Sequence, residues 1–412
     1  MPCVSIKREQ LDFLDWELGV FFHFGIRTFY EGHVDWDMKE MPLEGFNPPK
    51  IDCDSWIKTV KDAGAKYAIL VCKHHDGFAN WPSAYTEYSV KNTPWLNGKG
   101  DVVNLFVDAC RKYDIKVGLY YSPAQFGSDK MNGKEYDDYF INQISELLTN
   151  YGKIDYLWFD GCGSEGHDYD TVRIVEAIRR CQPEILIFNM WDPDTRWAGN
   201  EAGFVELPNK NVLNKLSAFS INKSEGDSLS EYRFLPAECD CRMRLVNWFY
   251  SDNDEDTVKS VDELMGLYYL SVGRGANLLI NIGPDRSGKL PQKDANNLVA
   301  FGQRVKEIFS DKNRVEGNVL ASEKSVTMSF DNVEKINHVV ISEEICDENE
   351  IESFEIRVYP LPGGKPRTFY KGTTIGHKAI CTFPTMITKK IEIVFDKDKK
   401  VDVKAYYVPM FN

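Results

Sequence analysis

The first three-quarters of the chain alternate between two patterns of apolar residues. Short segments that are apolar at nearly every position predict strands buried on both faces, and segments with apolar residues every three or four positions predict amphipathic helices. About 310 residues of this alternation favour a parallel (β/α)8-like, TIM-type barrel over an open sheet. The predicted strands are 19–26, 67–72, 116–122, 154–161, 184–190 and 278–283, and the predicted helices are 54–64, 101–114, 136–152, 171–181 and a long helix that passes through Ile308.

From about residue 318 onward, apolar and polar residues alternate at every second position, as at Val326, Met328 and Phe330. This period is that of strands with one buried face, and several such strands in about 95 residues predict an antiparallel β-sandwich. We therefore predict a catalytic barrel at 1–315 and a C-terminal β-sandwich at 316–412. We expect the sandwich to pack against the barrel rather than to bind carbohydrate, because no cluster of aromatic residues stands out in it.

Composition and charge narrow the classes of partner. Hydrophobic residues make up 43% of the chain and aromatic residues 13%, which is enough to fill a large interior and argues against disorder. The formal net charge is −14 and the lysines and arginines do not cluster, which argues against nucleic acid and anionic membrane surfaces as partners. No stretch reaches about 18 apolar residues, so we expect no membrane span.

The N-terminus and the cysteines bear on the cellular compartment. The first 19 residues contain neither an apolar signal-peptide core nor a small-residue cleavage site. We therefore expect a cytoplasmic protein, or an extracellular or periplasmic one if a leader has been removed. The ten cysteines are scattered and only Cys239 and Cys241 are close in sequence, so we expect free thiols. The sequence gives no indication of the oligomeric state.

Polar and aromatic residues gather where the predicted strands end. In a β/α barrel the chemistry lies at the carboxyl ends of the strands, and the irregular pattern between 200 and 250 is expected of long loops that build a site. The residues at these positions are His23; His74, His75, Asp76 and Trp81; Tyr120, Tyr121 and Ser122; Trp158 and Asp160; Arg196, Trp197 and Glu201 in a loop after the fifth strand; and Glu238 in another loop.

Three interpretations of this set compete. A zinc site could be built from His23, His74, His75 and Asp160. However, adjacent residues on a strand point to opposite faces, whereas zinc ligands usually have H-x-H or H-x-x-x-H spacing, so we predict no metal and no cofactor. A structural role is commoner for any single histidine, but it does not account for so many polar and aromatic groups at one rim. Aromatic platforms beside dense hydrogen-bonding groups suit a carbohydrate, with carboxylates added for a glycoside hydrolase, and the platforms here are Trp36, Trp81, Trp158 and Trp197.

Six segments carry most of these residues, in order between about residues 10 and 310: VFFHFG, KHHDGFANWPS, GLYYSP, LWFDG, RWAGNEAG and SVGRGANLLINIGPDRSG. Together they resemble the α-L-fucosidases of glycoside hydrolase family 29. RWAGNEAG is similar to the subgroup restricted to α-1,3/1,4-linked fucose on branched glycans. The loop 161–170 is shorter than in that subgroup, and 204–216 lacks its Glu-Ser-Glu-Trp-like run. The resemblance implies a (β/α)8-like barrel followed by a β-sandwich, and a small fucosylated oligosaccharide as substrate.

The resemblance also implies a role for each matching residue. Asp160 matches the nucleophile and Glu201 the general acid/base of a retaining mechanism, whose carboxyl groups stand about 5–5.5 Å apart. Glu238 is the rival acid/base, as in a broad-specificity enzyme, and Glu206 is a more distant one. An inactive fucose-binding relative is the alternative to an enzyme. The expected substrate-binding residues are His23, Trp36, His74, His75, Tyr121, Trp158 and Arg196, together with Trp81 and Glu238.

Overall fold

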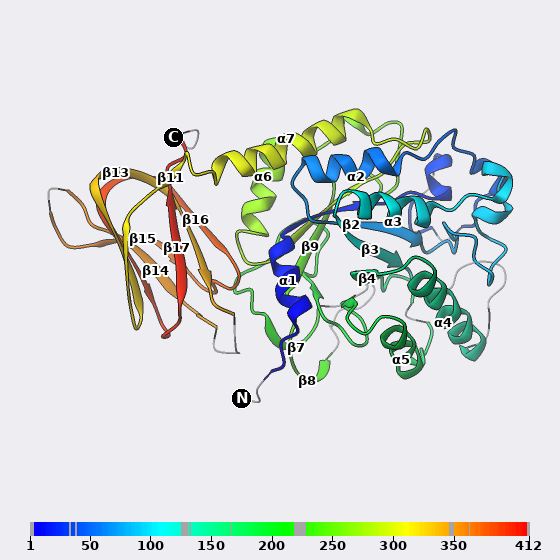
Figure 1. Cartoon of the computed structure of the whole chain (residues 1–412), viewed down its shortest axis with the longest axis horizontal. Helices are drawn as coiled ribbons and strands as arrows, with labels where there is room; N and C mark the ends of the chain where they lie inside the picture. The colour runs from blue at the N-terminus through cyan, green and yellow to red at the C-terminus, as the bar shows by residue number, and fades with distance from the viewer. Residues whose placement is uncertain are drawn as a thin grey trace.

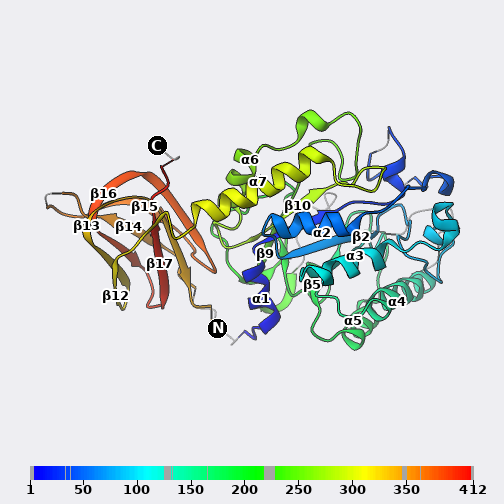
Figure 2. The ribbon, with the colours of Figure 1, turned by 45° about the horizontal axis from the view of Figure 1, so that its top comes forward.

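The chain forms a barrel and a β-sandwich that lie side by side (Figure 1). The computed structural model describes residues 4–32, 34–37, 39–124, 131, 133–164, 166–217, 228–345, 350–361 and 363–409. In two views that differ by a rotation of 45°, the last barrel helix runs over the barrel toward the sandwich (Figures 1 and 2).

Eight parallel strands form the wall of the barrel. Their order in the sheet is β5-β4-β3-β2-β1-β10-β9-β6. A parallel bridge between Phe188, at the end of β5, and Thr195, next to β6, brings the two edges of the sheet together. The predicted (β/α)8-like barrel is therefore confirmed. The strands are β1 (Leu18–Phe22), β2 (Tyr67–Lys73), β3 (Lys116–Tyr121), β4 (Tyr156–Phe159), β5 (Leu186–Phe188), β6 (Arg196–Trp197), β9 (Ala237–Arg242) and β10 (Asn277–Ile282).

Helices cover most of the outside of this wall. The helix α3 shows why they form: Asp101 caps its first turn by accepting a hydrogen bond from the Asn104 amide, and its apolar stripe is buried against the strands. Between β5 and β6, and between β6 and β9, the described residues form no helix; a hairpin of β7 (Val212–Lys215) and β8 (Ser228–Phe234) lies in the second interval. The α-helices are α1 (Arg8–Trp16), α2 (Cys53–Asp62), α3 (Val102–Lys112), α4 (Gly133–Asn150), α5 (Thr171–Cys181), α6 (Val261–Leu270) and α7 (Gln292–Ile308). Short 3-10 helices lie in loops at η1 (Ile26–Phe29), η2 (Leu43–Gly45), η3 (Val90–Asn92), η4 (Trp95–Gly98) and η5 (Glu255–Thr257).

Alternate residues of the strands fill the interior of the barrel. On β4, Tyr156 and Trp158 belong to one buried aromatic cluster that also contains Phe21 of β1 and Tyr120 of β3. Phe13 of α1 packs on the same cluster and closes the amino end of the barrel. Because side chains two apart on a strand share a face, the residues that follow this cluster by two positions emerge at the carboxyl end of the barrel.

The strand β9 differs from the sequence prediction. The sequence predicts a loop at Glu238, and this is wrong: Ala237–Arg242 is a fully integrated strand that pairs with β10 on one side and β6 on the other. Its Cys239 and Cys241 face the outer hydrophobic core, whereas its acidic residues alternate with them. Because carboxyl groups on the inner face of β9 interrupt its apolar run, the local composition of this buried strand resembles that of a loop.

The second domain is a seven-stranded antiparallel sheet folded into two layers, so the predicted β-sandwich is confirmed. The two long strands, β13 and β16, pair with β12 and β14 near one end and with β17 near the other. Register shifts between Ser329 and Glu334 and between Ile336 and His338 bend this pair and let it run through both layers. The strands are β11 (Arg314–Val315), β12 (Asn318–Ser322), β13 (Ser325–Glu343), β14 (Phe354–Val358), β15 (Arg367–Gly372), β16 (Ala379–Phe395) and β17 (Val401–Tyr406).

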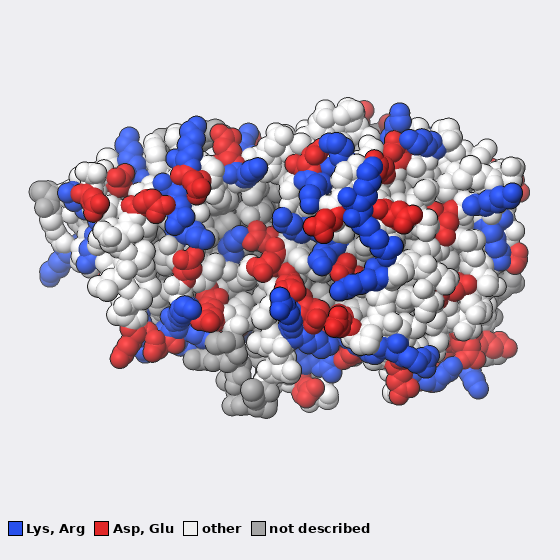
Figure 3. Space-filling model, viewed as in Figure 1, with Lys and Arg blue, Asp and Glu red and all other residues white. Residues whose placement is uncertain are grey.

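The sandwich packs directly on the barrel. Val340, Ile380 and Tyr406 of the sandwich belong to the main core cluster of the barrel, and the Ile380 amide donates a hydrogen bond to the Gly273 carbonyl at 2.9 Å. Basic and acidic side chains are interspersed over the face of the molecule in Figure 3. Among the described residues, no helix is long and apolar enough to cross a membrane.

Candidate active site

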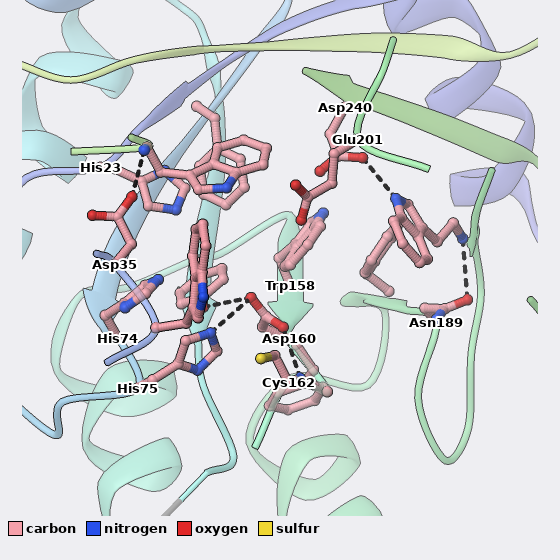
Figure 4. A pocket seen from close by; sticks show the side chains of 18 residues that line it. His23, Asp35, His74, His75, Trp158, Asp160, Cys162, Asn189, Glu201 and Asp240 are labelled. Carbon is pink, nitrogen blue, oxygen red and sulfur yellow. Dashed lines mark hydrogen bonds and ion pairs between the residues drawn. The ribbon is translucent and has the colours of Figure 1, made fainter. Parts of the chain in front are cut away.

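A pocket of about 150 Å³ opens at the carboxyl end of the barrel strands. This volume is below the ~300–1,000 Å³ of sites for drug-sized ligands and suits a ligand as small as one sugar ring. The carboxyl groups of Asp160 and Glu201 both point into it (Figure 4). Its lining consists of Phe21, His23, Asp35, Trp36, His74, His75, Tyr120, Trp158, Phe159, Asp160, Gly161, Cys162, Phe188, Asn189, Trp197, Glu201, Asp240 and Trp248.

Asp160 lies directly after β4, on the same face as Trp158, and its carboxyl group is held from three sides. The Tyr120 hydroxyl donates to Oδ2 at 2.8 Å and the Cys162 amide donates to Oδ1 at 2.9 Å. His75 Nε2 lies 3.5 Å from Oδ2. Burial and the charge of Asp160 raise the pKa of Tyr120 well above its ordinary value, so the phenol remains a donor. These contacts fix the orientation of the Asp160 carboxyl group in the pocket.

Both adjacent histidines reach the pocket because β2 ends at Lys73, before them. His74 and His75 lie in a turn closed by a hydrogen bond from the Gly77 amide to the His74 carbonyl, where Gly77 has a φ of +87°. Their ring centroids are 4.2 Å apart. The Asp76 side chain points elsewhere and accepts a hydrogen bond from Arg27 at 2.9 Å. The turn thus places two neighbouring imidazoles on one side of the pocket, as a straight strand would not.

The three pocket imidazoles are neutral at neutral pH. Desolvation lowers the pKa of His23 to about 3, the pKa of His74 well below its ordinary value, and the pKa of His75 despite the opposing charge of Asp160. The Asn281 amide nitrogen donates to the Trp248 carbonyl, so its Oδ1 accepts from His23 Nδ1 at 2.7 Å. His23 Nε2 is therefore a hydrogen-bond acceptor. Nδ1 of His74 is buried and has no partner in the described structure.

Glu201 lies on an exposed loop at the mouth of the pocket, after β6. Desolvation and the negative charge of Asp160 raise its pKa, and Arg242 acts in the opposite direction. A carboxyl with a raised pKa beside an ionised carboxylate is the arrangement in which one group donates a proton while the other remains charged.

Comparison with known proteins identifies the family to which the chain belongs. The sequence model of the α-L-fucosidase family matches residues 4–307. The chain belongs to this family. It is therefore a glycoside hydrolase. It is 30% identical to α-L-fucosidase 1 of Arabidopsis thaliana, over 98% of this chain and 88% of that protein. A glycoside hydrolase 29 family member from an unknown rumen bacterium is 31% identical with a TM-score of 0.87, over 99% of this chain and 78% of that one. The crystal structure of SpGH29 is 28% identical with a TM-score of 0.88, over 98% and 99%.

Four residues that the sequence analysis assigned to sugar binding in this α-L-fucosidase family member lie outside the pocket lining. Trp81 is buried and donates its Nε1–H to Glu146 at 2.9 Å. Tyr121 points away from the barrel interior and donates to Gln143 at 2.7 Å. Arg196 donates to Asn209 and to the Lys210 carbonyl. These three side chains and the fully buried Glu238 do not line the pocket, so their assignment to substrate binding stays a prediction.

The pocket also contains residues that are absent from the expected substrate-binding set, although the sequence analysis names one of them, Trp197, as an aromatic platform. Tyr120 and Trp197 are the immediate neighbours of Tyr121 and Arg196, and they face inward where those two face outward. Asp35 precedes the half-exposed Trp36 and accepts a hydrogen bond from the Trp248 amide. Asp240 lies two positions after Glu238 on β9. Alternation from Trp158 could have indicated the inward tyrosine, whereas the loop that carries Asp35 has no periodic signal.

The neighbouring tyrosines provide a matched test of this geometry. Tyr120→Phe removes the donor to Asp160, and we expect a loss of about 10- to 100-fold in kcat/KM, because a hydrogen bond to a charged group contributes roughly 1.5–3 kcal/mol. Tyr121→Phe removes the bond to Gln143, outside the pocket, and is expected to reduce the free energy of unfolding by about 1 kcal/mol with kcat/KM unchanged. Steady-state kinetics and thermal unfolding of both variants measure this. Equal losses of kcat/KM in the two variants would contradict the assignment of the inward tyrosine.

Glu238 supports the pocket floor from below. It accepts hydrogen bonds from Tyr67 at 2.6 Å and from Trp158 Nε1 at 2.8 Å, and Tyr156 lies 3.4 Å away. Its side chain is fully buried, and this desolvation raises its pKa to about 7 in spite of the three donors. An enclosed carboxyl beneath Trp158 cannot reach a leaving group in the pocket, which argues against Glu238 as the acid/base.

Because burial raises the pKa of Glu238, the free energy of unfolding of the protein is expected to depend on pH. Glu238 stays protonated up to about pH 7 in the folded protein, whereas it loses its proton near pH 4.5 in the unfolded chain. Its contribution to the free energy of unfolding is therefore fully present below pH 4.5 and is lost as the pH rises through 7. Glu238→Gln does not titrate, and it should therefore become more stable relative to the wild type between pH 4.5 and 8, by at most about 3 kcal/mol. Unfolding at several pH values, with Glu206→Gln as the exposed control, measures the trend. A pH-independent difference would contradict it.

Among the described residues, no three His, Cys, Asp or Glu side chains are grouped as a metal site would require. Two of the three histidines that the zinc interpretation invoked have other partners: His23 contacts Asn281, and His75 contacts Ser122 Oγ at 2.7 Å.

Proposed function

We propose that this glycoside hydrolase is a retaining exo-α-L-fucosidase that releases terminal α-1,3/1,4-linked fucose from oligosaccharides or glycoconjugates. The observation that carries the proposal is the pairing of Asp160, oriented at the pocket floor, with Glu201 at the pocket mouth. The small volume of the pocket supports exo action, because it suits one terminal sugar and leaves the rest of the glycan outside.

The lining suits a deoxysugar. Neutral imidazoles of His23 and His74 and the carboxylate of Asp35 offer acceptors and donors for ring hydroxyls. Trp158 stacks on Phe188 with ring centroids 4.2 Å apart and forms an apolar wall beside Asp160. Such a wall can pack against the methyl group and the CH-rich face of fucose. Aromatic surface and hydroxyl-binding groups thus meet within one pocket.

In the proposed reaction Asp160 attacks the anomeric carbon while Glu201 gives its proton to the departing glycosidic oxygen. A glycosyl ester forms on Asp160 and the aglycone leaves as an alcohol. The ester removes the negative charge that raises the pKa of Glu201, so the Glu201 carboxylate then accepts a proton from water as the water attacks the same carbon. Fucose is released with its original anomeric configuration, and Asp160 is restored.

The linkage preference rests on the similarity of RWAGNEAG to the α-1,3/1,4 subgroup, and it is tested with two substrates. The protein is incubated with an aryl α-L-fucoside and with a Lewis-type trisaccharide that carries α-1,3/1,4-linked fucose, and the first anomer released is read by proton NMR. Release of α-fucose mainly from the trisaccharide supports the proposal. Release mainly from the aryl fucoside favours a broad-specificity enzyme, and release from neither favours a fucose-binding protein.

A further inference from the structure

A third carboxyl group, that of Asp240, lines the pocket beside the proposed catalytic pair (Figure 4). It lies on the inner face of β9, two positions after Glu238, and only 3% of the residue is exposed. Its Oδ1 accepts a hydrogen bond from Trp197 Nε1 at 2.6 Å. A carboxyl is costly to bury, and this one contacts a pocket tryptophan while taking no part in the proposed reaction, which points to a separate role.

The loop that carries Glu201 is attached to β9 on both sides of Asp240. At its start, Trp197 pairs in parallel with Glu238, and the Ala198 amide donates to the Glu238 carbonyl at 2.8 Å. At its end, Ala202 forms an antiparallel bridge with Cys241. Residues 198–203 therefore form a short arch over β9, with Glu201 within it.

Close packing holds the end of this arch. Gly203 has a φ of +79°, and a Cβ there would lie 3.1 Å from Cys241 Sγ. At the start of the arch, the Trp197 amide donates to Asn189 Oδ1 at 3.1 Å. On the pocket side, the side-chain bond between Trp197 and Asp240 is a further attachment of the arch that carries Glu201.

The charge state of Asp240 follows from its surroundings. Desolvation raises its pKa well above the ordinary value, the charges of Glu201 and Glu238 act in the same direction, and the Trp197 indole acts in the opposite one. Oδ1 is engaged as the acceptor of the indole, which leaves Oδ2 as the oxygen that can hold a proton. An ionised Asp240 would add a second negative charge near Glu201 and oppose the fall of its pKa after the glycosyl ester forms.

We propose that Asp240, as a neutral carboxylic acid, is a positioning residue for Glu201: it anchors the Trp197 indole, and with it the arch, without adding charge to the general acid. The inference rests on the role proposed for Glu201. It assigns the Asp240 carboxyl a purpose that is distinct from sugar binding.

The test compares Asp240→Ala with Asp240→Asn on two fucosides, methyl α-L-fucoside and 2,4-dinitrophenyl α-L-fucoside. The methyl glycoside needs a proton on its leaving oxygen and the dinitrophenyl glycoside does not. We expect Asp240→Ala to lower kcat/KM about 10- to 100-fold for the methyl glycoside and less than about threefold for the dinitrophenyl one, because only protonation is impaired. Asp240→Asn keeps a neutral acceptor for the indole and should restore most of the lost kcat/KM. The alkaline limb of its pH profile of kcat/KM should lie at the same pH as in the wild type. Trp197→Phe should reproduce the alanine variant.

Two results would overturn the inference. One is an equal loss of kcat/KM on both fucosides in Asp240→Ala, which would mean that the whole pocket is disturbed. The melting temperature of the variant and its inhibition constant for free fucose show whether this has happened. The other is a shift of the alkaline limb to lower pH in Asp240→Asn, which means that the wild-type carboxyl is charged. Glu201→Gln is measured in parallel. If that variant shows no dependence on the leaving group, the role of Glu201 fails first; if it does and Asp240→Ala does not, only the inference on Asp240 fails.

Discussion

Replacement of Asp160 by alanine is expected to lower kcat by about 1,000-fold or more, because the variant lacks the carboxyl group on which the glycosyl ester is proposed to form. The fold should be retained: Asp160 lies after β4, 25% of its side chain is exposed, and its contacts are with the pocket rather than with the core. The melting temperature should therefore stay close to that of the wild type. Initial rates on 2,4-dinitrophenyl α-L-fucoside measure the loss without a contribution from protonation of the leaving group.

Adding sodium azide to Asp160→Ala tests whether Asp160 is the nucleophile. In Asp160→Ala, azide can occupy the space of the missing carboxyl and attack the anomeric carbon directly, so the product is the β-L-fucosyl azide. A single displacement of this kind inverts the configuration. An α-configured product, or turnover equal to that of the wild type, would remove Asp160 from the role of nucleophile.

Replacement of Glu201 by glutamine is expected to have the second-largest effect, and the effect should depend on the leaving group. For a glycan or alkyl fucoside, kcat/KM should fall about 100- to 10,000-fold, the usual range for loss of a general acid. For the dinitrophenyl fucoside, formation of the glycosyl ester should be nearly unaffected and its hydrolysis should become rate-limiting. Pre-steady-state kinetics would then show a burst of dinitrophenol followed by slow turnover.

Glu206 provides the matched control for this variant. It lies five residues further along the chain, is exposed and does not line the pocket, so Glu206→Gln should retain wild-type kinetics on both substrates. Azide added to Glu201→Ala should replace water in the second step and give the α-L-fucosyl azide, opposite in configuration to the product of the Asp160 variant. A loss that is the same for all leaving groups would contradict the role of Glu201 as general acid.

The sequence predicts the barrel where apolar runs and helical spacing are strong. β1, β2, β3, β4, β5 and β10 all overlap predicted strands. The prediction fails at β9, because the inner face of this strand carries Glu238 and Asp240, and their burial depends on donors from residues distant in sequence, such as Tyr67 and Trp197. Long-range hydrogen bonds of this kind leave no periodic signal within the segment that they stabilise.

The differences between the expected substrate-binding residues and the pocket lining have a common cause. Parallel strands buried on both faces are apolar throughout, so local sequence does not indicate which of two neighbours faces inward. The resemblance assigns Tyr121 and Arg196 to substrate binding, whereas their neighbours Tyr120 and Trp197 line the pocket. Asp160 carries a chemical signal of its own, since an ionisable side chain directly after a buried strand contributes little to packing and is costly to desolvate. The inward face becomes certain only when the register of the whole barrel is known.

Asp160 and Glu201 follow strands of different length and pairing, and this difference affects where the sequence can change in evolution. Asp160 follows β4, a strand paired on both sides and covered by helices, so changes within that strand would disturb folding as well as activity, even though the partly exposed Asp160 side chain itself can be replaced. Glu201 follows β6, a strand of two residues in the part of the wall where the described chain has no helix outside it. Insertions in the loops around β6 would therefore disturb fewer strand and helix contacts than insertions near β4. If Asp160 and Glu201 have the proposed roles, relatives of this protein should vary more in the loops around β6, and hence in the leaving group that they accept, than around β4.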